Sequence, residues 1–276
     1  MIKKYKPTSE GLRTRKTLVK GIENVKPLKS LTKGKKGPSG RSRGRISSRH
    51  KQRGAKRLLR DVDFKRNKLD IPAKVVSIED DPNRGSNIAL LSYVDGEKRY
   101  IIAPEGLKVG MTVVSGEDVE VSVGNSLPLS KIPVGSPIHN IEINPKAGGI
   151  LCRGAGNQAQ VIAKEGNYVN VKLPSSEVKK IRGICYATIG VVGNVDKRNV
   201  VLGKAGRSRH LGRRPHVRGV AMGDPHGDHP HAGKYSTSGV GMHPKTPWGK
   251  KAKGVKTRKR KRTDYTIVTR RKAKKR

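Results

Sequence analysis

Residues 87–103 read NIALLSYVDGEKRYIIA, and this stretch decides the fold class. Two strand-length runs rich in aliphatic residues, Asn87–Tyr93 and Glu97–Ala103, flank the dipeptide Asp95-Gly96. An Asp-Gly pair between two such runs is typical of a tight hairpin turn. The stretch therefore predicts two antiparallel strands joined by a short turn.

Shorter runs of the same kind lie on both sides of this hairpin. Ile71–Ile78 precedes it, and Thr112–Ser115 and Val119–Val123 follow it, separated by the glycines at positions 110, 116 and 124. About five short strands with little helical periodicity are typical of a small β-barrel. We expect this barrel to span residues 61–125.

A second set of short strands follows the first. Val161–Glu165 and Tyr168–Leu173 flank Gly166-Asn167, a second hairpin signal, and Val178–Ile181 and Tyr186–Gly190 come next. Ile141 and Ile143 also alternate with polar neighbours. The prolines at positions 128, 133 and 137 suggest a boundary near residue 126. The body is therefore predicted to be two small barrels in tandem, residues 61–125 and 126–200.

Charge divides the chain differently. It has 62 Lys and Arg against 21 Asp and Glu, a formal net charge of +41. Residues 1–60 carry +19 and residues 201–276 carry +20, whereas residues 61–200 carry only +2. Both ends are too poor in large apolar side chains to build a core, so we expect long, irregular basic arms. A polyanion must neutralise them: a membrane surface, DNA or RNA.

Several observations narrow the possible partners and the expected cellular location. No run of about 18 apolar residues exists, which argues against a membrane span. The Lys-rich start has no apolar stretch of the secretory kind. Cys152 and Cys185 lie outside any CxxC pattern, so a reduced cytosolic protein is expected, with a disulfide as the alternative.

The basic residues gather in clusters within the arms. Arginine grips phosphate in a bidentate manner, and interleaved glycines let the backbone approach closely. Because aromatic residues make up only 3% of the chain, backbone and shape recognition of folded RNA fits better than stacking on single strands. Generic electrostatics without a defined site is the alternative. The predicted RNA-binding residues are Arg41, Arg45, Arg49, His50, Arg57, Arg60, Lys65, Arg66, Arg84, Lys204, Arg207, Arg209, Arg213, Arg214, Arg218, Trp248, Lys256 and Arg258.

Six of the eight histidines fall after residue 200, several of them within residues 224–231, DPHGDHPH. The stretch has the residue types of a zinc site but not the usual ligand spacing, so imidazoles that bind RNA or pack in a loop are preferred. Asp228 and His229 could pair with Ser236 or Ser238 in a hydrolase, but no nucleophile elbow or Walker loop is present. We therefore expect no enzyme, no catalytic residue, no metal and no cofactor.

Many ordered motifs are shared with a known family. They include Lys6-Pro7-Thr8-Ser9, Asp63-Phe64-Lys65-Arg66, Asp81-Pro82-Asn83-Arg84, Arg99-Tyr100-Ile101-Ile102-Ala103-Pro104, Gly203-Lys204-Ala205-Gly206-Arg207, Leu211-Gly212-Arg213-Arg214-Pro215, Asp228-His229-Pro230-His231 and Thr246-Pro247-Trp248-Gly249. Over nearly its whole length the chain resembles the bacterial-type large-subunit ribosomal protein L-two family.

The resemblance implies a mainly β fold, an OB-like barrel followed by an SH3-like barrel, with irregular basic arms. It also implies binding to large-subunit ribosomal RNA, a role in subunit association, and support for the peptidyl transferase centre, where RNA is the catalyst. Asp228 and His229 would lie near that centre. Expected partners are ribosomal RNA, other ribosomal proteins and the small subunit across the subunit interface, with no membrane and no homo-oligomer. The expected location is the cytoplasm, in a bacterial-type ribosome, with an organellar ribosome left open.

The sequence departs from the family pattern at a few places. Lys51-Gln52-Arg53-Gly54 stands where the family has a glycine run, and His210 stands where it has Trp. Ala232-Gly233-Lys234-Tyr235 replaces a Gly-rich, acid-containing stretch, so no role is carried over to His231. Two other classes remain as alternatives: a nucleoid or chromatin polycation that packages DNA, and a zinc hydrolase built on residues 226–243.

Overall fold

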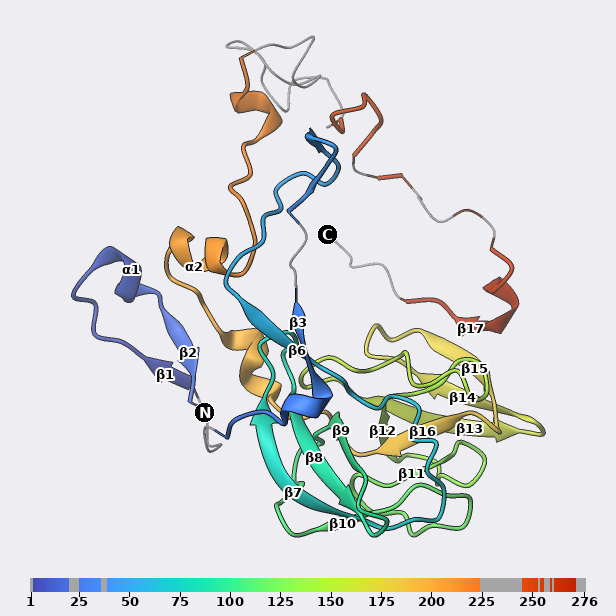
Figure 1. Ribbon diagram of the computed structural model, residues 1–276. Coiled ribbons are helices and arrows are strands. Elements are labelled where there is room, and N and C mark those ends of the chain that lie inside the picture. Colours follow the sequence, from blue (N-terminus) through green and yellow to red (C-terminus); the bar gives the residue numbers. More distant parts are fainter. Residues whose placement is uncertain are drawn as a thin grey trace. The chain divides into compact units, whose positions relative to one another are not determined.

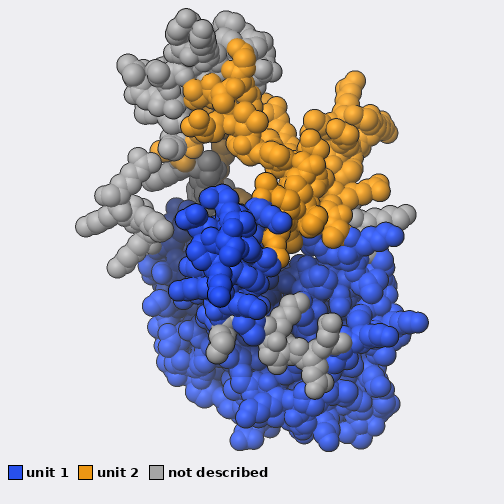
Figure 2. Space-filling model, turned by 90° about the vertical axis from the view of Figure 1, so that its left-hand side faces the viewer, with its two compact units in different colours: residues 1–36, 56–204, 265–276 blue, residues 37–55, 205–264 orange. Residues whose placement is uncertain are grey.

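The computed structural model describes residues 2–19, 25–35, 39–223, 245–252, 254–255, 259 and 261–271. It divides into two compact units (Figure 2). The body unit comprises residues 1–36, 56–204 and 265–276, and the basic unit comprises residues 37–55 and 205–264. Within the described ranges, no helix has the length and apolar character needed to cross a membrane.

The first sheet of the body unit has four antiparallel strands in the order β10-β7-β8-β9 (Figure 1). Their bounds are β7 (Ala73–Asp80), β8 (Asn87–Tyr93), β9 (Lys98–Ile102) and β10 (Thr112–Val113). The predicted hairpin is confirmed, because β8 pairs with β9 around a turn in which the Gly96 N–H donates to the Tyr93 carbonyl at 3.0 Å.

The strand β8 is apolar along most of its length because it is buried on both faces. Ala89 and Leu91 pack in one core cluster, whereas Ile88 and Leu90 pack in another. A strand covered on both faces gains from an unbroken aliphatic run. The run that decided the fold in the sequence therefore lies at the centre of this barrel.

Residues before the barrel cover one of these two core clusters. Leu28 and Leu31 pack against the cluster that contains Tyr100. The Leu28 N–H donates to Tyr100 Oη at 3.0 Å, and that hydroxyl donates to the Glu79 carboxylate at 3.0 Å. Burial raises the pKa of Tyr100 to about 12, so the hydroxyl keeps its proton. Next to this contact, β3 (Thr32–Lys35) pairs with β6 (Arg57–Arg60).

The second sheet has seven strands in the order β11-β16-β12-β13-β14-β15-β17. Their bounds are β11 (Ser126–Pro128), β12 (Pro137–His139), β13 (Ala159–Glu165), β14 (Tyr168–Lys172), β15 (Val178–Arg182), β16 (Tyr186–Ile189) and β17 (Ile267–Thr269). The predicted turn at residues 166–167 is confirmed by the pairing of Glu165 with Tyr168. The two curled sheets are an OB-like barrel followed by an SH3-like barrel, as the resemblance implied.

One predicted strand is wrong. Val119–Val123 forms a loop, although its valines alternate with polar residues. Its polar groups are satisfied locally, since the Ser122 N–H donates to the Glu120 carbonyl at 2.8 Å and the Asn125 amide donates to the same carbonyl at 3.0 Å. Local bonds of this kind compete with pairing between strands.

Two of the prolines near residue 130 lie at strand ends within the second sheet. Pro128 ends β11 and Pro137 begins β12, both within the second sheet. β11 is the edge strand of that sheet, where a residue without an N–H leaves no ladder bond unmade. The division at residue 126 stays a prediction.

The arms hold more regular structure than their composition predicts. The remaining short elements are β1 (Ile2–Lys4), α1 (Glu10–Arg13), β2 (Lys16–Leu18), η1 (Lys29–Leu31), β4 (Arg41–Ser42), β5 (Arg45–Ile46), η2 (Val195–Asn199), α2 (Ala205–His210), η3 (Gly219–Ala221) and η4 (Asp264–Thr266). β1 pairs with β2, and β4 pairs with β5.

Cys152 and Cys185 are free thiols, and burial raises the pKa of each to about 11.

Candidate nucleic-acid interface

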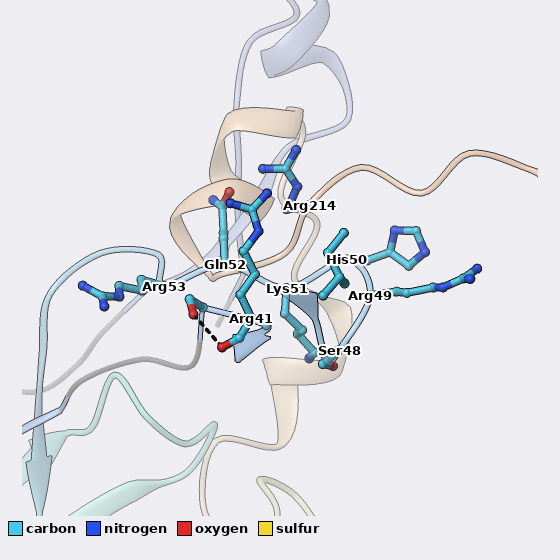
Figure 3. A pocket seen from close by; sticks show the side chains of 11 residues that line it. Arg41, Ser48, Arg49, His50, Lys51, Gln52, Arg53 and Arg214 are labelled. Atoms are coloured by element: carbon cyan, nitrogen blue, oxygen red, sulfur yellow. Dashed lines mark hydrogen bonds between the residues drawn. The ribbon is translucent and has the colours of Figure 1, made fainter. Parts of the chain in front are cut away.

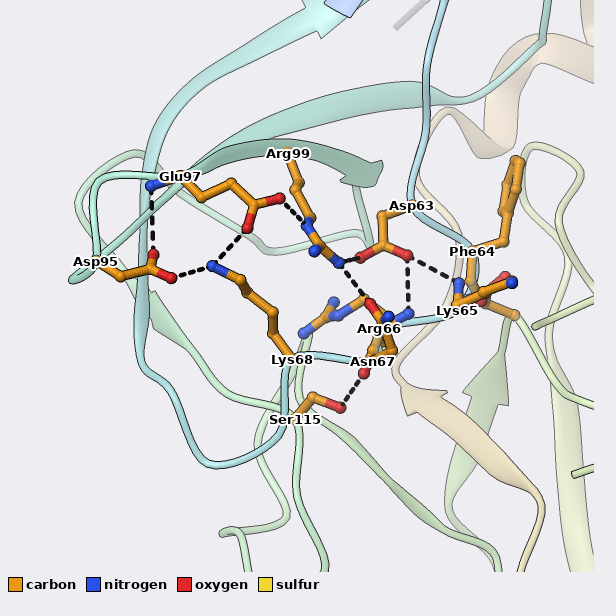
Figure 4. Close-up of polar contacts among 11 residues, drawn as sticks. Asp63, Phe64, Lys65, Arg66, Asn67, Lys68, Asp95, Glu97, Arg99 and Ser115 are labelled. Carbon is orange, nitrogen blue, oxygen red and sulfur yellow. Dashed lines mark hydrogen bonds and ion pairs between the residues drawn. The ribbon is translucent and has the colours of Figure 1, made fainter. Parts of the chain in front are cut away.

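Two cations of the OB-like barrel are neutralised by carboxylates of the same barrel (Figure 4). Lys68 forms ion pairs with Asp95 and Glu97. Arg99 lies 2.6 Å from Glu97 and 3.0 Å from Asp63. Hydrogen bonds from Arg99 and Lys68 lower the pKa of Glu97 to about 2. These side chains neutralise one another and leave little net charge for a polyanion.

Arg66, predicted to bind RNA, is instead buried. Its side chain is 3% exposed, and Nη1 donates to the Gly124 carbonyl at 3.3 Å. The Ser115 hydroxyl donates to the Arg66 carbonyl at 2.9 Å, which ties two loops together. Removal from water lowers the pKa of the guanidinium. The structure therefore corrects this assignment: Arg66 supports the fold and is not a surface residue.

Two guanidinium groups lie close to the ring of Phe64, the only phenylalanine of the chain. Arg84 is 5.4 Å from the ring centroid and Arg153 is 4.4 Å from it. Arg84 also forms an ion pair with Asp81 at 2.6 Å, so its charge is partly neutralised within the protein. Arg153 is exposed and was missed by the sequence reasoning, because it stands alone outside every basic cluster.

A hollow of about 520 Å³ in the body unit contains this ring. It is lined by fifteen residues, among them Phe64, Arg153 and Lys65, whose side chain is exposed. The predicted residues Arg57 and Arg60 lie on β6, half-buried, and donate to the carbonyls of Pro82 and Leu58 at 3.2 Å. The predicted Lys204 is exposed, also in the body unit.

The basic unit joins segments that lie about 160 residues apart in the sequence. The Gln52 N–H donates to the Gly212 carbonyl at 3.0 Å, and the Arg214 N–H donates to the His50 carbonyl at 3.0 Å. Lys51 and Arg213 form a β-bridge between these bonds. Basic residues of the N-terminal arm and of the C-terminal arm are therefore parts of one folded unit.

The crossing of the two segments requires a glycine. Gly54 has φ +73°, and a Cβ at this position would lie 2.5 Å from the His210 carbonyl oxygen. Only glycine fits both the left-handed backbone and the close approach. Gly54 is the one glycine of Lys51-Gln52-Arg53-Gly54, the tetrapeptide that stands where the family has a glycine run.

Several predicted residues surround a second hollow, of about 620 Å³, in the basic unit (Figure 3). It is lined by Ser39, Gly40, Arg41, Ile46, Ser48, Arg49, His50, Lys51, Gln52, Arg53 and Arg214. None of these residues is Asp or Glu. The hydrogen-bonded crossing fixes the backbone that carries several of these cations, as an anion-binding surface requires.

The basic unit differs from the OB-like barrel in having almost no carboxylates, among its described residues, to neutralise its cations. Among the described residues of the basic unit, Asp264 is the only carboxylate. The predicted residues Arg45, Arg213 and Arg218 are exposed, while Arg207 and Arg209 are half-buried on α2. Uncompensated cations at this density repel one another until an anion neutralises them.

Other predicted residues cannot all be placed. Trp248 is 72% exposed, with the guanidinium of Arg49 at 5.5 Å from its ring. Asp228, His229, Lys256 and Arg258 lie outside the described residues, as does the stretch weighed as a zinc site. The part of the chain that is described contains no group of three or more potential metal ligands.

Two small barrels joined to an uncompensated, arginine-rich surface define a polyanion-binding protein of the small-barrel class. Residues 28–115 match the model of the Ribosomal Proteins L2, RNA binding N-terminal domain, and residues 122–249 match that of the Ribosomal Proteins L2, C-terminal domain. The chain belongs to the ribosomal protein L2 family. It is a structural, rRNA-binding protein of the large ribosomal subunit, with rRNA and other ribosomal proteins as its partners.

Proposed function

We propose that the basic unit is the principal phosphate-binding surface of this chain, and that it holds folded large-subunit rRNA. The observation that carries the proposal is the near absence of carboxylates among the described residues of that unit. Neutralising phosphates releases condensed counterions from RNA, and this release supplies most of the binding free energy of such surfaces. The barrel's self-neutralised cations contribute far less.

The arrangement also favours a defined RNA shape over generic electrostatics. Arg41 and Arg214 come from the two segments joined at the crossing, and both line the same hollow. Guanidinium groups carried on a hydrogen-bonded backbone can bind phosphates in a bidentate manner, whereas a lysine ammonium binds as a point charge. We expect the surface to follow the backbone of an RNA fold and not a simple duplex.

A second contact is proposed for the body unit. Phe64, Lys65 and Arg153 line a hollow that offers an aromatic ring and exposed cations, and Asp61, Asp63 and Glu97 line it as well. Arg84 belongs to the same contact through Phe64. This region carries less net positive charge than the basic unit. We therefore expect it to orient the RNA and to contribute less to the affinity.

We further propose that the chain promotes subunit association and supports the peptidyl transferase centre, without taking part in bond formation. Family membership and the Asp228–His231 motif support this role. The ribosome would be of bacterial type, and the chain would act as a single copy. On this proposal Asp228 and His229 approach the centre while RNA performs the chemistry.

The test uses large subunits reconstituted with a His229→Ala chain. We expect incorporation of the variant to match that of the unchanged protein, with a loss of peptide bond formation or of subunit joining. Normal activity in both assays would refute the proposed role of His229. Sedimentation addresses the DNA-packaging alternative, because association with nucleoids and not with large subunits would favour that class.

A further inference from the structure

Trp248 lies at the tip of a tight turn. The Thr246 N–H donates to the Lys250 carbonyl at 2.7 Å, and the Gly249 N–H donates back to the Thr246 carbonyl at 2.9 Å. Gly249 has φ +75°, the left-handed conformation that closes such a turn. The turn therefore presents the indole on a defined backbone.

The exposure of this side chain is unusual. Trp248 is the only tryptophan of the chain, and 72% of it is accessible in the structure. Tryptophan is highly buried on average, and exposed examples are concentrated where a partner covers them. Most of the indole therefore remains open to a ligand.

Arg49 connects Trp248 to the hollow of the basic unit. Its guanidinium lies 5.5 Å from the indole centroid, and the same residue lines the hollow with Arg41 and Arg214. An exposed cation–π contact of this kind is weak, so it orients the two side chains without closing the site. An aromatic surface and a phosphate-binding hollow thus share one residue.

This pairing matches the chemistry of a nucleotide. A base has a π-face that stacks on indole, and its phosphate needs cations nearby. An apolar protein side chain could cover Trp248, but it would leave the cations of Arg49, Lys250 and Lys251 without an anion. The ligand is therefore expected to be a nucleic acid.

We propose that Trp248, flanked by Arg49, stacks on one unpaired base of the rRNA while a neighbouring phosphate lies in the hollow of the basic unit. The base must be unpaired or bulged, since both faces of a base inside a helix are already covered by its neighbours. This inference rests on the proposed function of the basic unit. It adds one point of base stacking to a surface that otherwise binds phosphates.

Because Trp248 is the sole tryptophan, its fluorescence reports on this site alone when tyrosine is not excited. The full chain is titrated with deproteinised large-subunit rRNA and, separately, with inorganic polyphosphate, which has no bases. We expect rRNA to quench the emission over the concentration range in which it binds, and polyphosphate to bind with little quenching. Bound rRNA with unchanged emission would overturn the inference.

Two variants complete the test. Trp248→Phe keeps an aromatic face and should retain most of the rRNA affinity, whereas Trp248→Ala should lower it by about five-fold to a hundred-fold. Equal affinities for the two variants would also overturn the inference. Quenching only after ribosomal proteins are added would assign the site to a protein partner instead.

These outcomes separate the inference from the proposed function. rRNA binding that depends steeply on salt but leaves Trp248 unquenched would contradict the stacking alone. Loss of that salt dependence would contradict the phosphate-binding surface itself, and with it the stacking site.

Discussion

Removing three cations from the basic unit should reduce the salt dependence of rRNA binding. The variant is Arg41→Gln, Arg45→Gln and Arg214→Gln in one chain. All three side chains are exposed, and none of the residues lining the neighbouring hollow is a carboxylate. Glutamine keeps a polar side chain, so the fold of the unit should be preserved.

The magnitude follows from counterion release. Each phosphate contact contributes roughly 0.7–0.9 to the slope of log affinity against log salt, so three lost contacts should lower the slope by roughly two to three. At about 0.1 M salt the affinity should fall by roughly a hundred-fold or more, and the difference should narrow as salt increases. Filter binding or fluorescence anisotropy over a salt series measures both quantities.

The matched control removes the same number of charges from the body unit. Its three lysines are already paired with carboxylates, namely Lys33 with Asp61, Lys131 with Asp118 and Lys180 with Glu165. Lys33 and Lys131 are exposed, and Lys180 is half-buried. The Lys33→Gln, Lys131→Gln, Lys180→Gln chain should keep a slope close to that of the unchanged protein. Equal losses in the two variants would refute the reasoning, because total charge and not its placement would then decide binding.

Three further outcomes follow from the same structure. Gly54→Ala should destabilise the basic unit by about 1–2 kcal/mol or more, because Gly54 has a left-handed backbone and lies close to the His210 carbonyl. Gly206→Ala is the control, because open space surrounds Gly206, and it should not destabilise the unit. Equal hydrogen-exchange protection of residues 50–55 in the two variants would contradict this prediction. Arg66→Ala should leave a cavity that lowers the free energy of unfolding by about 2–5 kcal/mol, while the salt dependence of rRNA binding stays unchanged. A reduced salt dependence would show that Arg66 contacts the RNA. Burial lowers the pKa of His139 to about 4 from 6.5, so only the unfolded chain takes up a proton at this residue as the pH falls below 6.5. About 3 kcal/mol of the free energy of unfolding should therefore be lost between pH 7 and pH 4. His139→Gln should reduce this pH dependence, and an unchanged pH profile in the variant would contradict the prediction.

Local pattern was sufficient where local contacts decide the structure. The hairpin of residues 87–103 and the turn at residues 166–167 were predicted because strand runs and turn residues are adjacent in the sequence. Val119–Val123 had the same alternation but formed a loop, since its polar groups bond to one another. Alternation alone does not reveal that competition.

Non-local pairing could not be predicted in this way. β17 lies in a basic tail and joins β15 about 90 residues earlier, without a distinctive local pattern. The crossing of Lys51 with Arg213 likewise depends on two distant segments. The sequence therefore predicted two basic arms but not the one folded unit that parts of them form.

Burial and side-chain contacts decide which arginines can reach the RNA. Arg66 has the same residue type as Arg41, and arginine is rarely buried, so the sequence favoured a surface position for both. Only the structure distinguishes the buried side chain from the exposed one. Arg153 was missed for the opposite reason, because it gains its place from the ring of Phe64 and not from basic neighbours.

The most direct test of the claim that rRNA occupies the uncompensated surface is chemical modification of arginine, read by mass spectrometry with and without bound rRNA. The account predicts that rRNA protects Arg41, Arg45 and Arg214 of the basic unit, while the exposed Arg182 of the body unit reacts equally in both states. Unchanged reactivity of the first three residues in the complex, with protection of Arg182, would contradict it.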